Sequence, residues 1–171
     1  KYAKICIDNG IVPIIEPEVL LEGEHSMEKS EEVTTKTLKV VFDAIKSLKV
    51  PLNEIILKTS MVVPGNKSGQ IMNPEEIAER TARCLRASVP AELGGVVFLS
   101  GGQTPVQATE NLNAINALAK SQGIIWQLSF SFARALQAEA LKVWAGQDQN
   151  VKIAQDAFLG RVKRVSLARQ G

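Results

Sequence analysis

Four short apolar runs, each followed by a helical pattern, are the feature that most restricts how this chain can fold. The runs are rich in β-branched and aromatic residues and are nearly continuous in apolarity, which is typical of strands buried on both faces of a parallel sheet. We expect these strands at Ile11–Val19, Glu54–Val62, Gly95–Gly102 and Ile124–Ser131. Because parallel neighbours are joined through helices in right-handed crossovers, the alternation predicts an α/β fold.

The helical patterns carry recognisable start and stop signals. We expect five helices over residues 30–48, 73–89, 104–121, 133–146 and 150–170. The apolar face of the first would comprise Val33, Thr37, Val40, Val41, Ala44 and Leu48. The second and third begin at Asn73 and Thr104, each with a capping box and a proline at the first helical position. Gly146 is the predicted stop between the last two.

The spacing of the strand ends distinguishes between two α/β folds. Glu16 and Lys58 are 42 residues apart, and Lys58 and Ser100 are again 42 apart. Ser131 follows Ser100 by 31 residues. Units of this size suit a TIM barrel, in which eight units take about 250 residues, so four units make half a barrel. A doubly wound open sheet is the competing fold, but the G-x-G-x-x-G turn expected after its first strand does not occur.

Composition excludes several classes of protein. The 171 residues are 45% hydrophobic and 22% charged, as in one ordinary globular domain. A net charge of +2 gives no reason to expect binding to nucleic acid or to an anionic membrane, and no apolar run is long enough to span a bilayer. Two cysteines and the single His25 do not make a metal site, and Cys84 fits a helical core position. Without a signal peptide, a cytoplasmic location is expected.

Lys58 interrupts the second apolar run, directly after Ile55, Ile56 and Leu57. Burying an unpaired ammonium is costly, and the usual result is a depressed pKa. A lysine that is neutral near pH 7 is a nucleophile able to form a Schiff base with a carbonyl. The alternative is that Lys58 caps the end of the strand and extends to water.

Polar residues and glycines gather where each run stops, at the edge on which a barrel builds its active site. They are Glu16, Glu18, Lys58, Ser60, Ser100, Gly101, Gly102, Ser129, Ser131 and Arg134. Alternation places Glu16 and Glu18 on one side of their strand. It likewise places Lys58 and Ser60 on one side of theirs. Any one of these residues could be a polar strand end at the surface, but four successive strand ends together favour a site.

Each of these residue types suits a step of carbonyl chemistry on a phosphorylated substrate. Lys58 would be the nucleophile, Glu16 would move protons, and Glu18 would orient the amine. The backbone N–H groups of Gly101 and Gly102, with the Ser100 hydroxyl, precede a helix N-terminus and suit a phosphate. Arg134 would add a bidentate contact to the same anion. The simpler alternatives are a tight turn for the glycines and a solvent-facing arginine.

Several segments, in order along nearly the whole chain, resemble class I fructose-bisphosphate aldolase. They read "GIVPIIEPEVLLEGEH", "ILKTSMVVPG", "GVVFLSGGQ", "NLNAIN" and "SFSFARALQAEALKVW". The similarity is to strands five to eight of that enzyme's TIM (β/α)8 barrel. We therefore expect residues 1–171 to form the C-terminal half of a barrel, as part of a longer enzyme whose N-terminal half is absent from the chain.

The resemblance also implies roles for individual residues. Lys58 aligns with the Schiff-base lysine, and Glu16 aligns with the general acid/base. The positions that align with the phosphate site are Ser100, Gly101, Gly102, Ser131 and Arg134. The implied reaction is the reversible cleavage of fructose 1,6-bisphosphate to dihydroxyacetone phosphate and glyceraldehyde 3-phosphate in glycolysis. It requires no metal or other cofactor, because the iminium is the electron sink. The implied protein is a cytoplasmic homo-oligomer, commonly a tetramer.

Three departures from the family pattern accompany the resemblance. Thr59-Ser60 stands where the family usually has Pro-Asn, and Ala133 stands where a glycine often precedes the arginine. The family's upstream aspartate and second lysine, and its tail ending in tyrosine, have no counterpart here. The alternatives are a half-barrel that dimerises, a transaldolase-like barrel, or a non-catalytic module that binds phosphate or mediates assembly.

Overall fold

The computed structural model describes all residues 1–171 and contains one parallel sheet with the strand order β1-β2-β3-β4. The strands are β1 (Ile14–Ile15), β2 (Ile56–Thr59), β3 (Gly95–Phe98) and β4 (Leu128–Phe130). Each strand after β1 pairs with the one before it in the sequence, and a helix connects the two members of each pair. The expected α/β architecture of four consecutive barrel units is confirmed.

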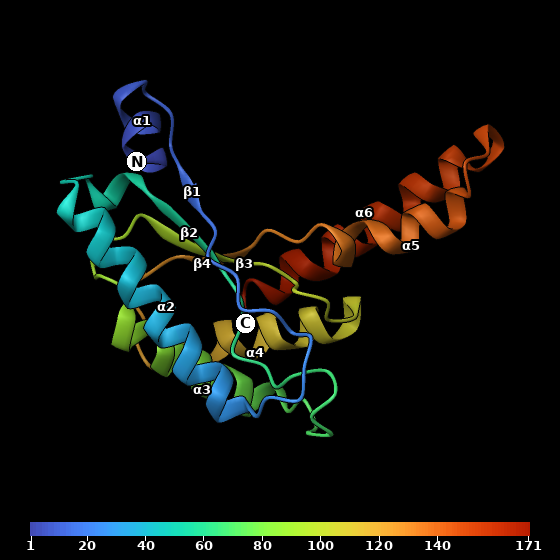
Figure 1. Cartoon of the computed structure of the whole chain (residues 1–171). Helices are drawn as coiled ribbons and strands as arrows, with labels where there is room; N and C mark the ends of the chain where they lie inside the picture. Colours follow the sequence, from blue (N-terminus) through green and yellow to red (C-terminus); the bar gives the residue numbers. More distant parts are fainter.

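Six helices accompany this sheet, and three of them cover one of its faces. They are α1 (Tyr2–Asp8), α2 (Met27–Ser47), α3 (Pro74–Ser88), α4 (Pro105–Ser121), α5 (Arg134–Trp144) and α6 (Val151–Ala168), with 3-10 turns η1 (Leu52–Glu54) and η2 (Asp148–Asn150). Figure 1 shows α2, α3 and α4 side by side below the sheet, whereas α5 and α6 pack together and extend away from it. None of these helices combines the length and apolarity needed to cross a bilayer.

The predicted helix boundaries agree with the structure to within a few residues. At the start of α4, the Thr104 hydroxyl accepts the Gln107 N–H and the Gln107 side chain accepts the Thr104 N–H, so this capping box is complete. At the start of α3, Asn73 accepts the Glu76 N–H, but the Glu76 carboxylate binds Arg80 instead of returning to the cap. The second capping box is therefore only half formed. The short helix α1 was not predicted.

The two faces of the sheet differ in burial. Leu57 and Val96 face the helices and are fully buried, whereas Ile56, Lys58 and Val97 lie on the other face and are half-buried. Lys58 is level with Val97 in the β2–β3 register. The prediction of strands buried on both faces is wrong, because no helix or loop of the chain covers the second face (Figure 1). In a closed barrel that face lines the interior.

The buried face of α2 also differs from the prediction. It comprises Met27, Ser30, Thr34, Leu38, Phe42 and Ile45. The expected core positions Val40 and Leu48 are exposed instead, Val40 to 62%. The buried face is displaced by about one residue from the predicted one. The large side chains of Leu38 and Phe42 point into the core, and the small polar residues on the same face, Ser30 and Thr34, are therefore buried as well.

Candidate active site at the carboxyl ends of the strands

Lys58 and Glu16 form an ion pair where β1 and β2 end. Lys58 Nζ lies 2.7 Å from Glu16 Oε1. Because Ile15 is level with Leu57 in the parallel ladder, the next residues along each strand, Glu16 and Lys58, are brought side by side. The Lys58 side chain is 21% exposed and the Glu16 side chain 47%, so both reach the open face of the sheet. A carboxylate at this distance can exchange a proton directly with the amine.

This geometry corrects one expectation and leaves another without support. Lys58 does lie beside Glu16, but it is one member of an ion pair instead of an amine enclosed by apolar walls. Glu18, expected to orient the amine, is exposed and takes part in none of the side-chain hydrogen bonds or ion pairs of the chain. The strand β1 ends at Ile15, and Pro17 cannot donate to the ladder, so the alternation does not extend to Glu18.

Ser60 holds the loop after β1 against the end of β2. Its hydroxyl donates to Val19 O at 3.2 Å and accepts from Val19 N at 3.3 Å. Ser60 is buried, whereas Lys58 two residues earlier is partly open. These two hydrogen bonds hold the segment that contains Glu16 beside the strand that contains Lys58. Thr59 is buried on the helix side of β2, so the Thr59-Ser60 departure alters packing under the site.

The loops that follow β1 and β2 are hydrogen-bonded to each other through their backbones. Gly65 N donates to His25 O, Asn66 N to Leu21 O, and Lys67 N to Gly23 O, each at 2.9 Å. A Cβ added at Gly65 would lie 2.3 Å from Gly23 O, so only glycine permits this approach. The two loops therefore form one rigid rim of the site.

The Ser100–Gly102 turn lies at the end of β3. Gly101 and Gly102 have φ values of 52° and 87°, which are left-handed conformations that favour glycine. The turn leads through Thr104 into the N-terminus of α4, where backbone N–H groups are available to an anion. Ser100 is buried, and its hydroxyl makes no hydrogen bond within the chain.

The buried side chain of Gln103 connects the same turn to α4 and to the end of β2. Its side chain is buried and accepts a hydrogen bond from Asn111 Nδ2 at 2.6 Å. Its amide nitrogen lies 3.7 Å from the sulfur of Met61, just after β2. Sequence reasoning missed this residue, because a glutamine after a Gly-Gly turn carries no local signal of burial.

Ser131 and Arg134 follow β4, which runs beside β3. Ser131 N donates to Phe98 O at 2.8 Å, so the ends of these strands are adjacent. Ser131 is half-buried. Arg134 is the first residue of α5, is exposed, and forms no ion pair within the chain. Ser129 is level with Val97 on the open face of the sheet. The predicted site residues other than Glu18 thus lie at or beside the ends of adjacent strands.

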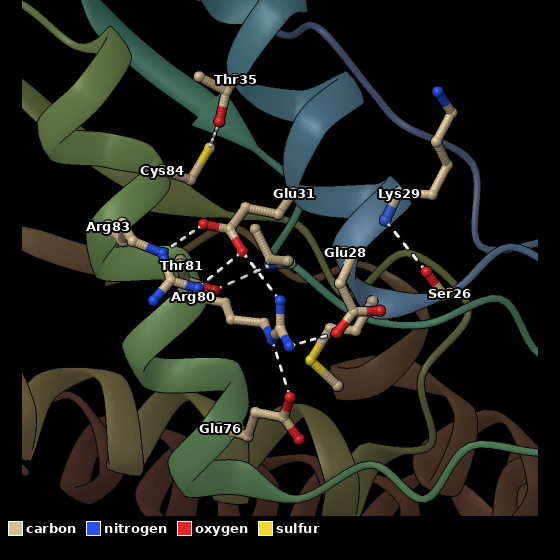
Figure 2. Close-up of polar contacts among 12 residues, drawn as sticks. Ser26, Glu28, Lys29, Glu31, Thr35, Glu76, Arg80, Thr81, Arg83 and Cys84 are labelled. Atoms are coloured by element: carbon tan, nitrogen blue, oxygen red, sulfur yellow. Dashed lines mark hydrogen bonds and ion pairs between the residues drawn. The ribbon is translucent and has the colours of Figure 1, made fainter.

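A second polar cluster lies away from this edge, between α2 and α3 (Figure 2). Arg80 binds Glu76, Glu28 and Glu31, and Arg83 donates two hydrogen bonds to Glu31. The hydrogen bonds from Arg83, opposed by burial and supported by Arg80, hold the pKa of Glu31 below its ordinary value. These charges join two helices on the outer layer, and we interpret them as structural.

Cys84 lies beside this cluster and is 1% exposed, which confirms the predicted core position. Burial raises the pKa of its thiol. Thr35 Oγ1 donates to its sulfur at 3.3 Å, as Figure 2 shows. A buried thiol with a raised pKa is inert as a nucleophile.

Comparison with known proteins identifies the family. The model of the "Fructose-bisphosphate aldolase class-I" family matches residues 1–171. The chain belongs to the class-I fructose-bisphosphate aldolase family. It is 48% identical over its whole length to "Fructose-bisphosphate aldolase 6, cytosolic" of Arabidopsis thaliana, covering 47% of that protein. It is 47% identical to "Fructose-bisphosphate aldolase" of Dictyostelium discoideum, again covering 47%.

A solved aldolase structure has the same fold. The chain superimposes with a TM-score of 0.94 and 44% identity on fructose-bisphosphate aldolase from Plasmodium falciparum, which was crystallised with TRAP and a small-molecule inhibitor. The match covers 99% of this chain and 48% of that one. The chain thus spans about half the length of the aldolases it matches. Relatives named chloroplastic occur beside those named cytosolic.

Proposed function

We propose that this chain supplies the C-terminal half of an aldolase barrel that reversibly cleaves fructose 1,6-bisphosphate to dihydroxyacetone phosphate and glyceraldehyde 3-phosphate. The observation that carries the proposal is the Lys58–Glu16 pair at the strand ends of a chain belonging to the class-I aldolase family. The covalent catalyst is Lys58 Nζ, which attacks the ketone carbon of the substrate.

The neighbouring carboxylate makes this attack possible. Glu16 Oε1 accepts a proton from Lys58 Nζ across the 2.7 Å contact, which leaves the nitrogen lone pair free. After the carbinolamine has formed, the protonated Glu16 returns a proton to its hydroxyl, which leaves as water and gives the iminium. The iminium withdraws electrons from the adjacent carbon–carbon bond, so the lysine itself supplies the electron sink and the mechanism calls for no metal or other cofactor.

A phosphate of the substrate is bound beyond this pair, on β3 and β4. We assign it to the backbone N–H groups of Gly101 and Gly102, the hydroxyls of Ser100 and Ser131, and the guanidinium of Arg134. Support comes from the adjacent strand ends, the left-handed glycines before the α4 N-terminus, and the absence of an internal partner for the arginine. An arginine without a competing carboxylate is available to an anion.

Borohydride trapping tests the proposal. Reduction in the presence of dihydroxyacetone phosphate converts the iminium to a stable secondary amine, which is detected as a mass increase on the peptide that contains Lys58. Lys58→Ala is the control and should remain unlabelled. A wild-type protein without an adduct would overturn the catalytic assignment.

That negative result would instead favour a non-catalytic module that binds phosphate or mediates assembly. The turn at Gly101 and Gly102, placed before the N-terminus of α4, could bind phosphate in such a module without any covalent step. Phosphate binding without trapping would identify this case.

We further propose a cytoplasmic homo-oligomer, in keeping with the relatives named cytosolic. The oligomer is inferred from membership of the class-I aldolase family, whose members are commonly homo-oligomers. Sedimentation of the intact protein would show its oligomeric state, and a monomer would contradict the proposal.

A further inference from the structure

Arg161 is a buried cation without a carboxylate partner. It lies on α6, is only 4% exposed, and forms no ion pair. Burial lowers the pKa of its guanidinium, and the like charge of Arg164 acts in the same direction. A charge buried without a counterion is destabilising unless its hydrogen bonds are fully used. Its position therefore calls for an explanation beyond packing.

The guanidinium forks between the first turns of two other helices. Its Nη2 atom donates to Pro105 O at 2.8 Å and to Thr109 Oγ1 at 2.7 Å, both on α4. Its Nε atom donates to Ala135 O on α5 at 3.3 Å. Thr109 Oγ1 in turn donates to Pro105 O at 2.7 Å, which closes the network on the α4 side. A planar guanidinium is suited to holding two such groups at a fixed separation.

These two helix turns are the ones that carry the proposed phosphate site. Pro105 follows the Ser100–Gly102 turn by three residues, and Ala135 directly follows Arg134. The α6 helix packs against both α4 and α5, so Arg161 is the point at which one helix contacts the starts of both. A shift of either helix would change the distance between Arg134 and the glycine N–H groups.

We propose that Arg161 is a positioning residue for phosphate: it fixes the N-terminus of α4 relative to the N-terminus of α5, and thereby the spacing of the two halves of the anion site. This inference rests on the phosphate site proposed above. Arg161 itself is buried beneath both helices and does not touch the anion.

The test separates phosphate recognition from carbonyl chemistry. Borohydride trapping on Lys58 is measured over a range of dihydroxyacetone phosphate concentrations and, separately, of dihydroxyacetone, which lacks the phosphate. Arg161→Met should raise the concentration of the phosphorylated ketone needed for half-maximal trapping by on the order of tenfold, as expected for a small displacement of binding groups. Trapping of dihydroxyacetone should not change, and inorganic phosphate should become a weaker competitor by the same factor.

Arg164→Met is the matched control. Arg164 lies three residues away on α6, is 54% exposed and pairs with Glu139 on α5, so its loss should leave both half-maximal concentrations unchanged. If Arg161→Met does not fold, Arg161→Lys replaces it, because an ammonium keeps the charge but cannot fork to both helices. It should show a smaller shift in the same direction.

Two results would overturn the inference. One is an unchanged preference for the phosphorylated ketone in the Arg161 variant, and the other is an equal shift for both ketones, which would indicate a general structural defect. Arg134→Ala distinguishes this failure from that of the proposed site. If Arg134→Ala also keeps the phosphate preference, the site itself is misassigned; if it loses the preference while the Arg161 variant keeps it, only the positioning role is wrong.

Discussion

The glutamate at the centre of the α2–α3 cluster allows a quantitative test of how the outer helices are held together. Glu31 accepts hydrogen bonds from Arg80 at 3.1 Å and from two nitrogens of Arg83 at 2.5 and 2.8 Å (Figure 2). Its side chain is 17% exposed, as is that of Arg80, whereas that of Arg83 is 60% exposed. Glu31→Gln keeps the shape of the side chain and removes its charge.

The burial of each partner sets the expected size of the effect. A hydrogen bond to a charged group contributes about 1.5–3 kcal/mol when sheltered, and an exposed ion pair about 0.2–1 kcal/mol. Water reaches Arg83, and glutamine retains one acceptor, so the contributions do not add in full. We expect Glu31→Gln to lower the free energy of unfolding by about 1.5 kcal/mol at pH 7. Urea denaturation followed by circular dichroism measures the difference.

The pH dependence gives an independent check. Because the folded-state pKa of Glu31 is depressed, its stabilising contribution is present above its unfolded-state pKa of about 4.3 and is lost as the pH falls through the folded-state value. The difference between wild type and Glu31→Gln should therefore shrink as the pH drops below about 4. Glu32→Gln, at an exposed position paired with Lys29, should show no comparable loss. Equal losses in both variants, or a difference independent of pH, would refute the reasoning.

Further predictions concern the site and its rim. Glu16→Gln should slow formation of the Lys58 adduct by about 10²–10⁴-fold, which is the usual contribution of a general acid/base. Stopped-flow trapping measures the rate, and the affinity for phosphate should be retained. An unchanged rate would show that Glu16 does not transfer the proton. Gly65→Ala should lower stability in thermal unfolding by about 1–3 kcal/mol through overpacking against Gly23 O, whereas Gly69→Ala, where an added Cβ meets no atom within 4 Å, is the control for strain without a clash. Cys84 should resist alkylation in the native protein and react after unfolding; rapid native labelling would contradict its burial.

The sequence predicts the sheet well because parallel strands and capped helices leave local patterns. The Thr104–Gln107 box and Pro105 directly after the cap locate the start of α4 correctly. Strand length is predicted less well: the run Ile11–Val19 yields only Ile14–Ile15 as strand. Pro13 and Pro17 lack the N–H that a ladder needs. Pro13 O still accepts a hydrogen bond from Ile56 N, and beyond Ile15 the segment is held beside β2 by the side chains of Lys58 and Ser60.

The pairing of the site residues depends on contacts that no local pattern encodes. Arg161 reaches Pro105 across 56 positions of sequence, and Ser60 reaches Val19 across 41. From sequence alone, a basic residue on a helix such as Arg161 is expected to face solvent, because its distant hydrogen-bond partners are not known. The strand-end pattern placed Glu16 and Lys58 in one site, but their direct contact depends on the β1–β2 register.

The strictly sequential order of the strands has a consequence for biosynthesis. Since β2 pairs with β1, β3 with β2 and β4 with β3, each newly emerging unit finds its only required neighbour already outside the ribosome. Lys58 can meet Glu16 as soon as the second unit has docked, well before α6 is translated. Arg161 is translated after both of the helix starts that it contacts, so among these four units the anion pocket would be completed after the nucleophile is in place.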